Sequence, residues 1–203
     1  MAGSAIVAEA LHRGHTVTAI SRKPEGLTLH ERLSVQGLDV TSSADLDPVL
    51  TDSDTAVLTI RLAPGDNHLL APATVRFLDA AARTGTRVIV LGGAAPLRSP
   101  NHPDRLVADD PAYVPAEWKA LAEASLAQFQ VCRQHPYSGW VYLSPPAIFE
   151  PGPRTAKYRR GTTQLLTDAG GTSRITSADL AIAVIDEIET PGGDRHFTVA
   201  QAV

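Results

Sequence analysis

The sequence predicts a doubly wound α/β fold, in which helices cover both faces of a mostly parallel sheet. Short, nearly all-apolar runs rich in β-branched residues recur along the chain. Such runs are typical of strands that are buried on both faces of a parallel sheet. Longer stretches with helical periodicity separate them. Regular alternation of strand and helix favours a parallel sheet with right-handed crossovers.

The expected strands are short. The second in the chain is the weakest, and the last is expected to be an edge strand. In chain order they are Val17–Ile20, Leu33–Val40, Ala56–Ile60, Val88–Leu91, Val141–Leu143 and Phe197–Val199.

Four helices are expected between the strands. Gly14 and Gly85 follow the first two and are typical helix stops. Thr176 and Asp179 have the spacing of a capping box at the start of the last one. The third helix should bury one face, formed by Trp118, Leu121, Ala122, Ser125, Phe129 and Cys132. The helices are predicted at Ala5–Arg13, Ala71–Arg83, Pro115–Gln134 and Leu180–Ile188.

Length and composition predict one cytoplasmic globular domain over residues 1–203. The net charge of −4, without a basic block, argues against nucleic-acid and membrane-surface partners. No apolar run approaches the ~20 residues that span a bilayer. A single cysteine, Cys132, fits a reducing compartment. The scattered histidines lack metal-ligand spacing, so no metal is expected. The sequence makes no prediction of oligomeric state.

Two features near the N-terminus indicate a dinucleotide. Gly3 precedes the first helix, where a glycine permits close packing of helix on sheet in nucleotide-binding folds. Arg22 and Lys23 follow the first strand, where an acidic residue would select NAD. A guanidinium there favours the 2′-phosphate of NADP. The alternatives are a flexible terminal glycine and a solvated basic turn.

Further candidates follow later strands. Asp39-Val40 could contact an adenine, or Asp39 could simply form a turn. Gly92-Gly93 would leave room for a ligand at the carboxyl end of a strand, or form a plain loop. Ser144-Pro145-Pro146 makes a rigid loop that could floor a nicotinamide pocket or serve as a stiff connection. The loop 92–113 is interpreted as a lid or as a disordered surface excursion.

With these elements placed, the chain resembles the atypical short-chain dehydrogenases/reductases. The flavin reductase or biliverdin-IXβ reductase type is the nearest, together with bacterial NADH-flavin reductases. The likeness covers nearly the whole chain. Its most specific parts are Met1–Ile6, His15–Arg22, Trp140–Pro146, Phe149–Arg159 and Ser173–Thr176.

The resemblance implies one Rossmann-like domain that binds NADP(H), with NAD(H) as the second possibility. By this likeness the pyrophosphate would lie by Gly3 and Ser4, and the 2′-phosphate by Arg22 with Lys23 beside it. Asp39 and Val40 would contact the adenine. Ile60, Gly92 and Gly93 would line the cleft. Ser144, Pro145 and Pro146 would lie near the nicotinamide.

The chain departs from the family pattern at its beginning. Members usually start with a strand and a G-A-T-G turn before the position of Met1, and both are lacking here. We therefore expect an N-terminally truncated form of the fold, most simply explained by a misplaced start. Removal of a central strand would expose two rows of backbone hydrogen-bonding groups.

The second departure concerns catalysis. The sequence has no Tyr-x-x-x-Lys pair, since Tyr113 and Lys119 are six residues apart. Ala147 stands where some relatives have histidine. No general acid is therefore assigned. Hydride transfer to a flavin-like or quinone-like planar acceptor needs no strong protein acid, which favours such a reductase. The alternatives are an NADP(H) sensor without turnover and, less favoured, a sugar-nucleotide epimerase or dehydratase.

Overall fold

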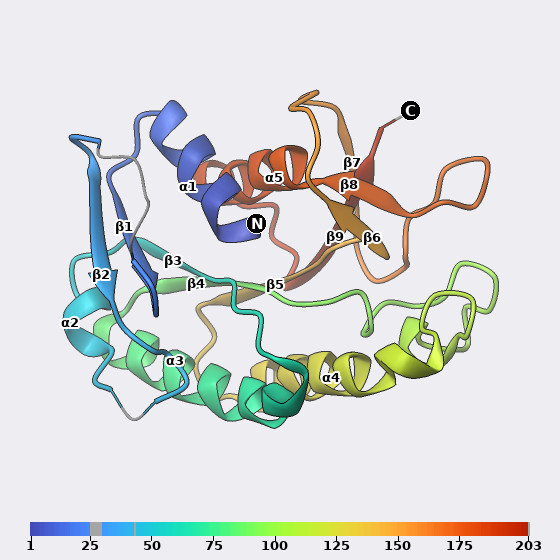
Figure 1. Ribbon diagram of the computed structural model, residues 1–203, viewed down its shortest axis with the longest axis horizontal. Coiled ribbons are helices and arrows are strands. Elements are labelled where there is room, and N and C mark those ends of the chain that lie inside the picture. Colours follow the sequence, from blue (N-terminus) through green and yellow to red (C-terminus); the bar gives the residue numbers. More distant parts are fainter. Residues whose placement is uncertain (25–29, 43, 203) are drawn as a thin grey trace.

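The computed structural model describes residues 1–24, 30–42 and 44–202. Its centre is a five-stranded sheet with the order β3-β4-β5-β9-β7 (Figure 1). The first four strands are parallel, and β7 runs antiparallel to β9. The strands span Thr55–Leu58 (β3), Arg87–Leu91 (β4), Trp140–Ser144 (β5), His196–Gln201 (β9) and Tyr158–Gly161 (β7).

A second, two-stranded sheet pairs β1 (Val17–Ser21) with β2 (Leu33–Gly37) in parallel. No ladder of backbone hydrogen bonds joins β1 to β3 within the described ranges. The parallel strands therefore form two separate pieces. A third pair, β6 (Ile148–Glu150) and β8 (Arg174–Thr176), is also parallel.

Helices form one layer on each face of the main sheet (Figure 1). α1 (Ala2–His12) and α5 (Ser177–Glu189) cover one face, and α3 (Leu70–Thr84) and α4 (Lys119–Gln134) cover the other. The short α2 (Asp47–Leu50) packs near α3. In the part of the chain that the structure describes, no helix has the length and apolar character needed to cross a membrane.

The hydrophobic core has two halves, as expected for a sheet between two helix layers. Along β4, Ile89 and Leu91 pack toward α1 and α5, whereas Val88 and Val90 pack toward α3 and α4. All four side chains are buried. This explains why the strand has no polar positions between Val88 and Leu91.

The structure confirms the predicted fold class and most of its elements. Gly14 and Gly85 both adopt positive φ angles, of 92° and 76°, at the ends of α1 and α3. The Thr176 hydroxyl accepts a hydrogen bond of 3.1 Å from the Asp179 N–H and caps α5. α1 begins earlier than predicted, at Ala2 rather than Ala5.

Two predictions about packing are wrong. The last strand is not an edge strand, because β9 lies between β5 and β7 and the sequence pattern did not reveal β7. The predicted buried face of α4 is also too long. Trp118 and Leu121, the first two residues of the predicted buried face, are 55% and 44% exposed.

The loop 92–113 is packed against the domain, so a disordered surface excursion is also a wrong expectation. Leu97 and Val107 are buried in a cluster with Leu165. Ser99 donates a buried hydrogen bond of 2.6 Å to the Asp110 carboxylate. The contact with Leu165 fixes the loop against the body of the domain, and the Ser99–Asp110 bond ties two parts of the loop together.

A buried carboxylate fastens α1 to the rest of the domain. Glu9 is only 5% exposed and accepts hydrogen bonds of 2.8 to 2.9 Å from Arg13 and Arg154. Arg13 also donates to Asp186 and Glu189 of α5, at 2.7 Å in each case. The hydrogen bond from Arg154, with help from Arg13, lowers the pKa of Glu9 from 4.5 to about 2.

We expect Glu9→Gln to lower the free energy of unfolding by on the order of 2 kcal/mol at pH 7. A carboxyl group whose pKa is depressed in the folded protein stabilises it above the unfolded pKa. That contribution is lost as the pH falls from about 4.5 toward about 2. Urea unfolding at several pH values measures it.

The matched control is Glu150→Gln, because the Glu150–Arg174 ion pair is about half exposed on both sides. This variant should change stability little at any pH. An equal loss in the two variants, or a loss in Glu9→Gln that persists unchanged at acidic pH, would contradict the role of the ionised Glu9.

Candidate functional site

The carboxyl ends of β3, β4 and β5 lie along one edge of the sheet because these strands are parallel. Thr59, Gly92 and Ser144 mark these ends. The beginning of α1 reaches the same edge, since an added Cβ at Gly3 would lie 3.5 Å from the Thr59 methyl group. The edge therefore combines a helix N-terminus with several strand ends, which is where open α/β sheets bind ligands.

At the start of α1 no side chain of a described residue caps the helix. Its first N–H groups are suited to an anion for this reason. Ser4 is exposed in the first turn, beside Gly3. The 3.5 Å contact between an added Cβ and Thr59 is an ordinary one, so close packing of the helix does not require glycine at position 3. The expected packing role of Gly3 is therefore wrong.

Arg22 and Lys23 are exposed directly beyond β1. Neither forms an ion pair with another residue in the described ranges. The nearby Asp39 carboxylate accepts hydrogen bonds from the Thr41 hydroxyl (2.6 Å) and N–H (2.9 Å). These bonds lower the pKa of Asp39, and the charges of Arg22 and Arg76 lower it further. Asp39 thus stabilises a turn while remaining close enough to Arg22 to interact with its charge.

Val40 and Ile60 are half-buried and pack against the cluster that includes Leu58 and Phe77. Arg76 of α3 donates to the carbonyl oxygen of Val40 at 3.3 Å and to that of Thr41 at 2.7 Å. The loop after β2 is therefore held against α3, although β2 has no ladder to the main sheet in the described ranges.

Contacts inside the protein require glycine at both positions of the pair after β4. A Cβ at Gly92 would overlap the Tyr142 ring and hydroxyl. A Cβ at Gly93 would lie 2.7 Å from the Ser125 hydroxyl oxygen, which accepts a 3.0 Å hydrogen bond from the Gly93 N–H. Room for a ligand is thus not the only reason for these glycines.

We expect Gly92→Ala to destabilise the protein by about 1–3 kcal/mol, because the new methyl group forces the fully buried Tyr142 to move. Thermal and urea unfolding measure this loss. Gly65→Ala is the control, since nothing lies within 4 Å of a Cβ there. An unchanged free energy of unfolding in Gly92→Ala would show that Tyr142 can move without destabilising the protein.

All three residues of the segment 144–146 are buried at the carboxyl end of β5. Ser144 is completely buried, and its hydroxyl lies 2.9 Å from Nε2 of His196. Burial, and next the charge of Arg133, lower the pKa of His196 to about 4, so the imidazole is neutral at pH 7. Sequence reasoning missed His196 because a single histidine in a strand carries no pattern.

Three further groups that could act as acids or nucleophiles are hydrogen-bonded, packed or buried within the protein. Lys119 Nζ donates to the Ala108 carbonyl oxygen at 2.9 Å and to Asp109 at 3.1 Å. Tyr113 packs near Leu97, and burial raises its pKa. Burial raises the pKa of the Cys132 thiol to about 12. Neither a Tyr–Lys pair nor an activated thiol is present among these groups.

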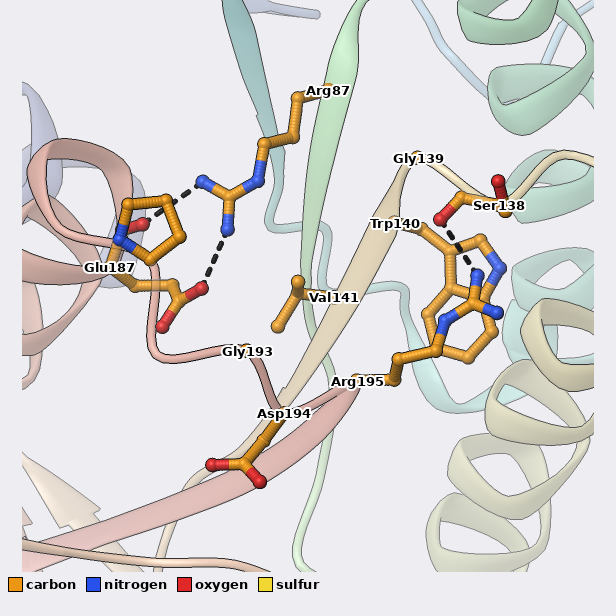
Figure 2. Close-up of a pocket in the computed structure, with 10 residues that line it drawn as sticks. Arg87, Ser138, Gly139, Trp140, Val141, Glu187, Gly193, Asp194 and Arg195 are labelled. Atoms are coloured by element: carbon orange, nitrogen blue, oxygen red, sulfur yellow. Dashed lines mark hydrogen bonds and ion pairs between the residues drawn. The ribbon is translucent and has the colours of Figure 1, made fainter.

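A cavity of about 370 Å³ lies elsewhere, at the amino ends of β4 and β5 (Figure 2). In it the Arg87 guanidinium bonds the buried Glu187, and the Arg195 guanidinium lies over the Trp140 ring. None of the predicted site residues lines this cavity. Described residues also contain no group of three or more His, Cys, Asp or Glu side chains placed to hold a metal.

A parallel sheet between two helix layers, with a helix N-terminus at its carboxyl edge, defines a Rossmann-like nucleotide-binding domain. Residues 1–191 match the family described as NAD(P)H-binding. The chain belongs to this family.

Several relatives share nearly the full length of the chain. Protein YwnB of Bacillus subtilis is 34% identical over 205 residues, covering 98% of this chain and 92% of YwnB. The structure of a candidate NADH-flavin reductase from Streptococcus pneumoniae is 30% identical, with a TM-score of 0.87 and coverage of 99% and 94%. A candidate epimerase from Bacteroides thetaiotaomicron is 29% identical, with a TM-score of 0.90 and coverage of 100% and 93%.

Proposed function

We propose that the protein is an NAD(P)H-dependent reductase that passes a hydride to a flavin-like or quinone-like planar acceptor. The observation that carries the proposal is the carboxyl edge of the sheet, where the start of α1 meets the ends of β3, β4 and β5 in an NAD(P)H-binding domain. The likeness to the streptococcal candidate NADH-flavin reductase supports the choice of acceptor.

The cofactor would be held by the residues that surround this edge. The N–H groups at Gly3 and Ser4 would face the pyrophosphate, and Arg22 with Lys23 the 2′-phosphate. Asp39, Val40 and Ile60 would lie on the adenosine side. Gly92, Gly93 and the segment Ser144–Pro146 would lie toward the nicotinamide, which when bound supplies the hydride.

The state of the polar side chains near this edge supports a flavin-like or quinone-like acceptor. The hydroxyl groups of Ser125, Tyr142 and Ser144 are buried and bonded within the protein. Because they are buried, an acceptor bound outside the sheet would not contact them. Reduction of a flavin or quinone can take its proton from solvent, so this arrangement suits it.

Arg22→Glu should weaken NADPH binding by about tenfold to a hundredfold and NADH binding much less. The reason is the loss of a charge-assisted bond to the 2′-phosphate and the gain of a repulsive carboxylate. Fluorescence titration with each cofactor measures both affinities. Arg105→Glu makes the same charge change on the loop 92–113 and serves as control. Equal weakening of NADPH and NADH would show that Arg22 does not contact the phosphate.

Purified protein should oxidise NADPH in the presence of FMN, riboflavin or menadione, followed at the absorbance of the reduced nicotinamide. Tyr113→Phe should leave the rate unchanged, because Tyr113 and Lys119 form no proton-donating pair. Binding of both cofactor forms without turnover of any acceptor would instead support an NADP(H) sensor. A strong rate loss in Tyr113→Phe would contradict solvent as the proton source.

A further inference from the structure

A second cavity, of about 250 Å³, lies between α4 and the beginnings of β5 and β9. It adjoins the cavity of Figure 2, with which it shares Trp140 and Arg195. We call it the aromatic cavity. Its lining residues are Phe129, Arg133, Trp140, Arg195 and His196.

Three rings form the apolar surface of this cavity. The Phe129 and His196 ring centroids are 4.4 Å apart. Trp140 is 5% exposed, and its indole N–H is buried without a hydrogen-bond partner in the described part of the chain. A planar ring is therefore the group that this surface fits best, by stacking or edge contacts.

The charge of the cavity comes from two guanidinium groups. Arg133 lies 5.9 Å from the Phe129 centroid and Arg195 lies 4.3 Å from the Trp140 ring. Arg195 donates to the Ser138 carbonyl oxygen at 2.7 Å, and neither arginine is paired with a carboxylate of a described residue. No acidic residue lines the cavity among the described residues, and His196 is neutral at pH 7. The site is therefore positively charged.

We propose that the aromatic cavity binds a small aromatic carboxylate. The ring would contact Phe129 and His196, and the carboxylate would lie between Arg133 and Arg195, whose planar forks match its geometry. A volume of about 250 Å³ is below the range of roughly 300–1,000 Å³ of drug-sized sites, so the ligand has a single ring. This site is independent of the proposed reductase activity.

Trp140 provides the measurement. The chain has two tryptophans, and Trp118 is 55% exposed outside the cavity, so Trp118→Phe leaves Trp140 as the sole indole. Because the Arg195 guanidinium covers the indole (Figure 2), a carboxylate that draws it aside changes the fluorescence. Titration with benzoate should give a saturable change with a Kd on the order of 0.1–1 mM, as expected for so small a ligand.

Benzamide has the same ring without the charge, and should bind at least about tenfold more weakly. Arg133→Gln in the Trp118→Phe background should weaken benzoate binding about tenfold or more, whereas Arg105→Gln should leave it unchanged. Arg133 is exposed and makes no hydrogen bond with a described residue, so its variant should fold, which circular dichroism and thermal unfolding check.

Three results would overturn the proposal: no saturable change up to about 20 mM benzoate, equal binding of benzamide, or undiminished binding by Arg133→Gln. The titration contains no nicotinamide cofactor. Its outcome is therefore separate from that of the NADPH oxidation assay, and either proposal can fail alone.

Discussion

The attachment of α1 to α5 is the constraint on which the arrangement of the domain depends. The β1–β2 pair shares no backbone ladder with the five-stranded sheet in the described ranges, so side chains must hold the two pieces together. On one face Arg13 donates to Asp186 and Glu189 of α5, and Glu9 accepts from Arg13 and Arg154. Arg76 does so on the other, through the loop after β2. The position of Arg22 relative to the glycine pair at 92–93 is therefore set by these contacts.

The two ends of β5 have different chemistry. At its carboxyl end the backbone and a helix N-terminus dominate, and at its amino end rings and guanidinium groups do. A hydrogen bond between Ser144 and His196 connects them, because His196 lines the aromatic cavity and Ser144 ends β5. Phe129 and Tyr142 pack against the same imidazole, with centroid distances to it of 4.4 and 5.6 Å. Ser144 is consequently held in place by the first residue of β9.

The sequence predicts the interior of this fold better than its periphery. β4 and β5 are buried on both faces, and continuous apolar runs record this directly. β7 has the sequence Tyr-Arg-Arg-Gly and so lacks an apolar pattern. Its arginines donate hydrogen bonds to the Thr167 carbonyl oxygen and to Glu187. The site shows the same division. Strand ends are visible in the sequence, but the clash that fixes Gly92 involves Tyr142, about fifty residues away in a strand that no local pattern links to it.

The hydroxyl groups near the carboxyl edge also bear on how a chain without a Tyr–Lys pair could carry out the proposed reduction. The Ser125 hydroxyl accepts a hydrogen bond from the Gly93 N–H and is itself bonded to the Tyr142 hydroxyl. The Ser144 hydroxyl is bonded to His196. Burial raises the pKa of Tyr142 far above neutrality, so its hydroxyl keeps its proton. Because the three hydroxyl groups are buried, a molecule bound outside the sheet would not contact them. In the proposed reductase the nicotinamide would therefore supply the hydride and solvent the proton.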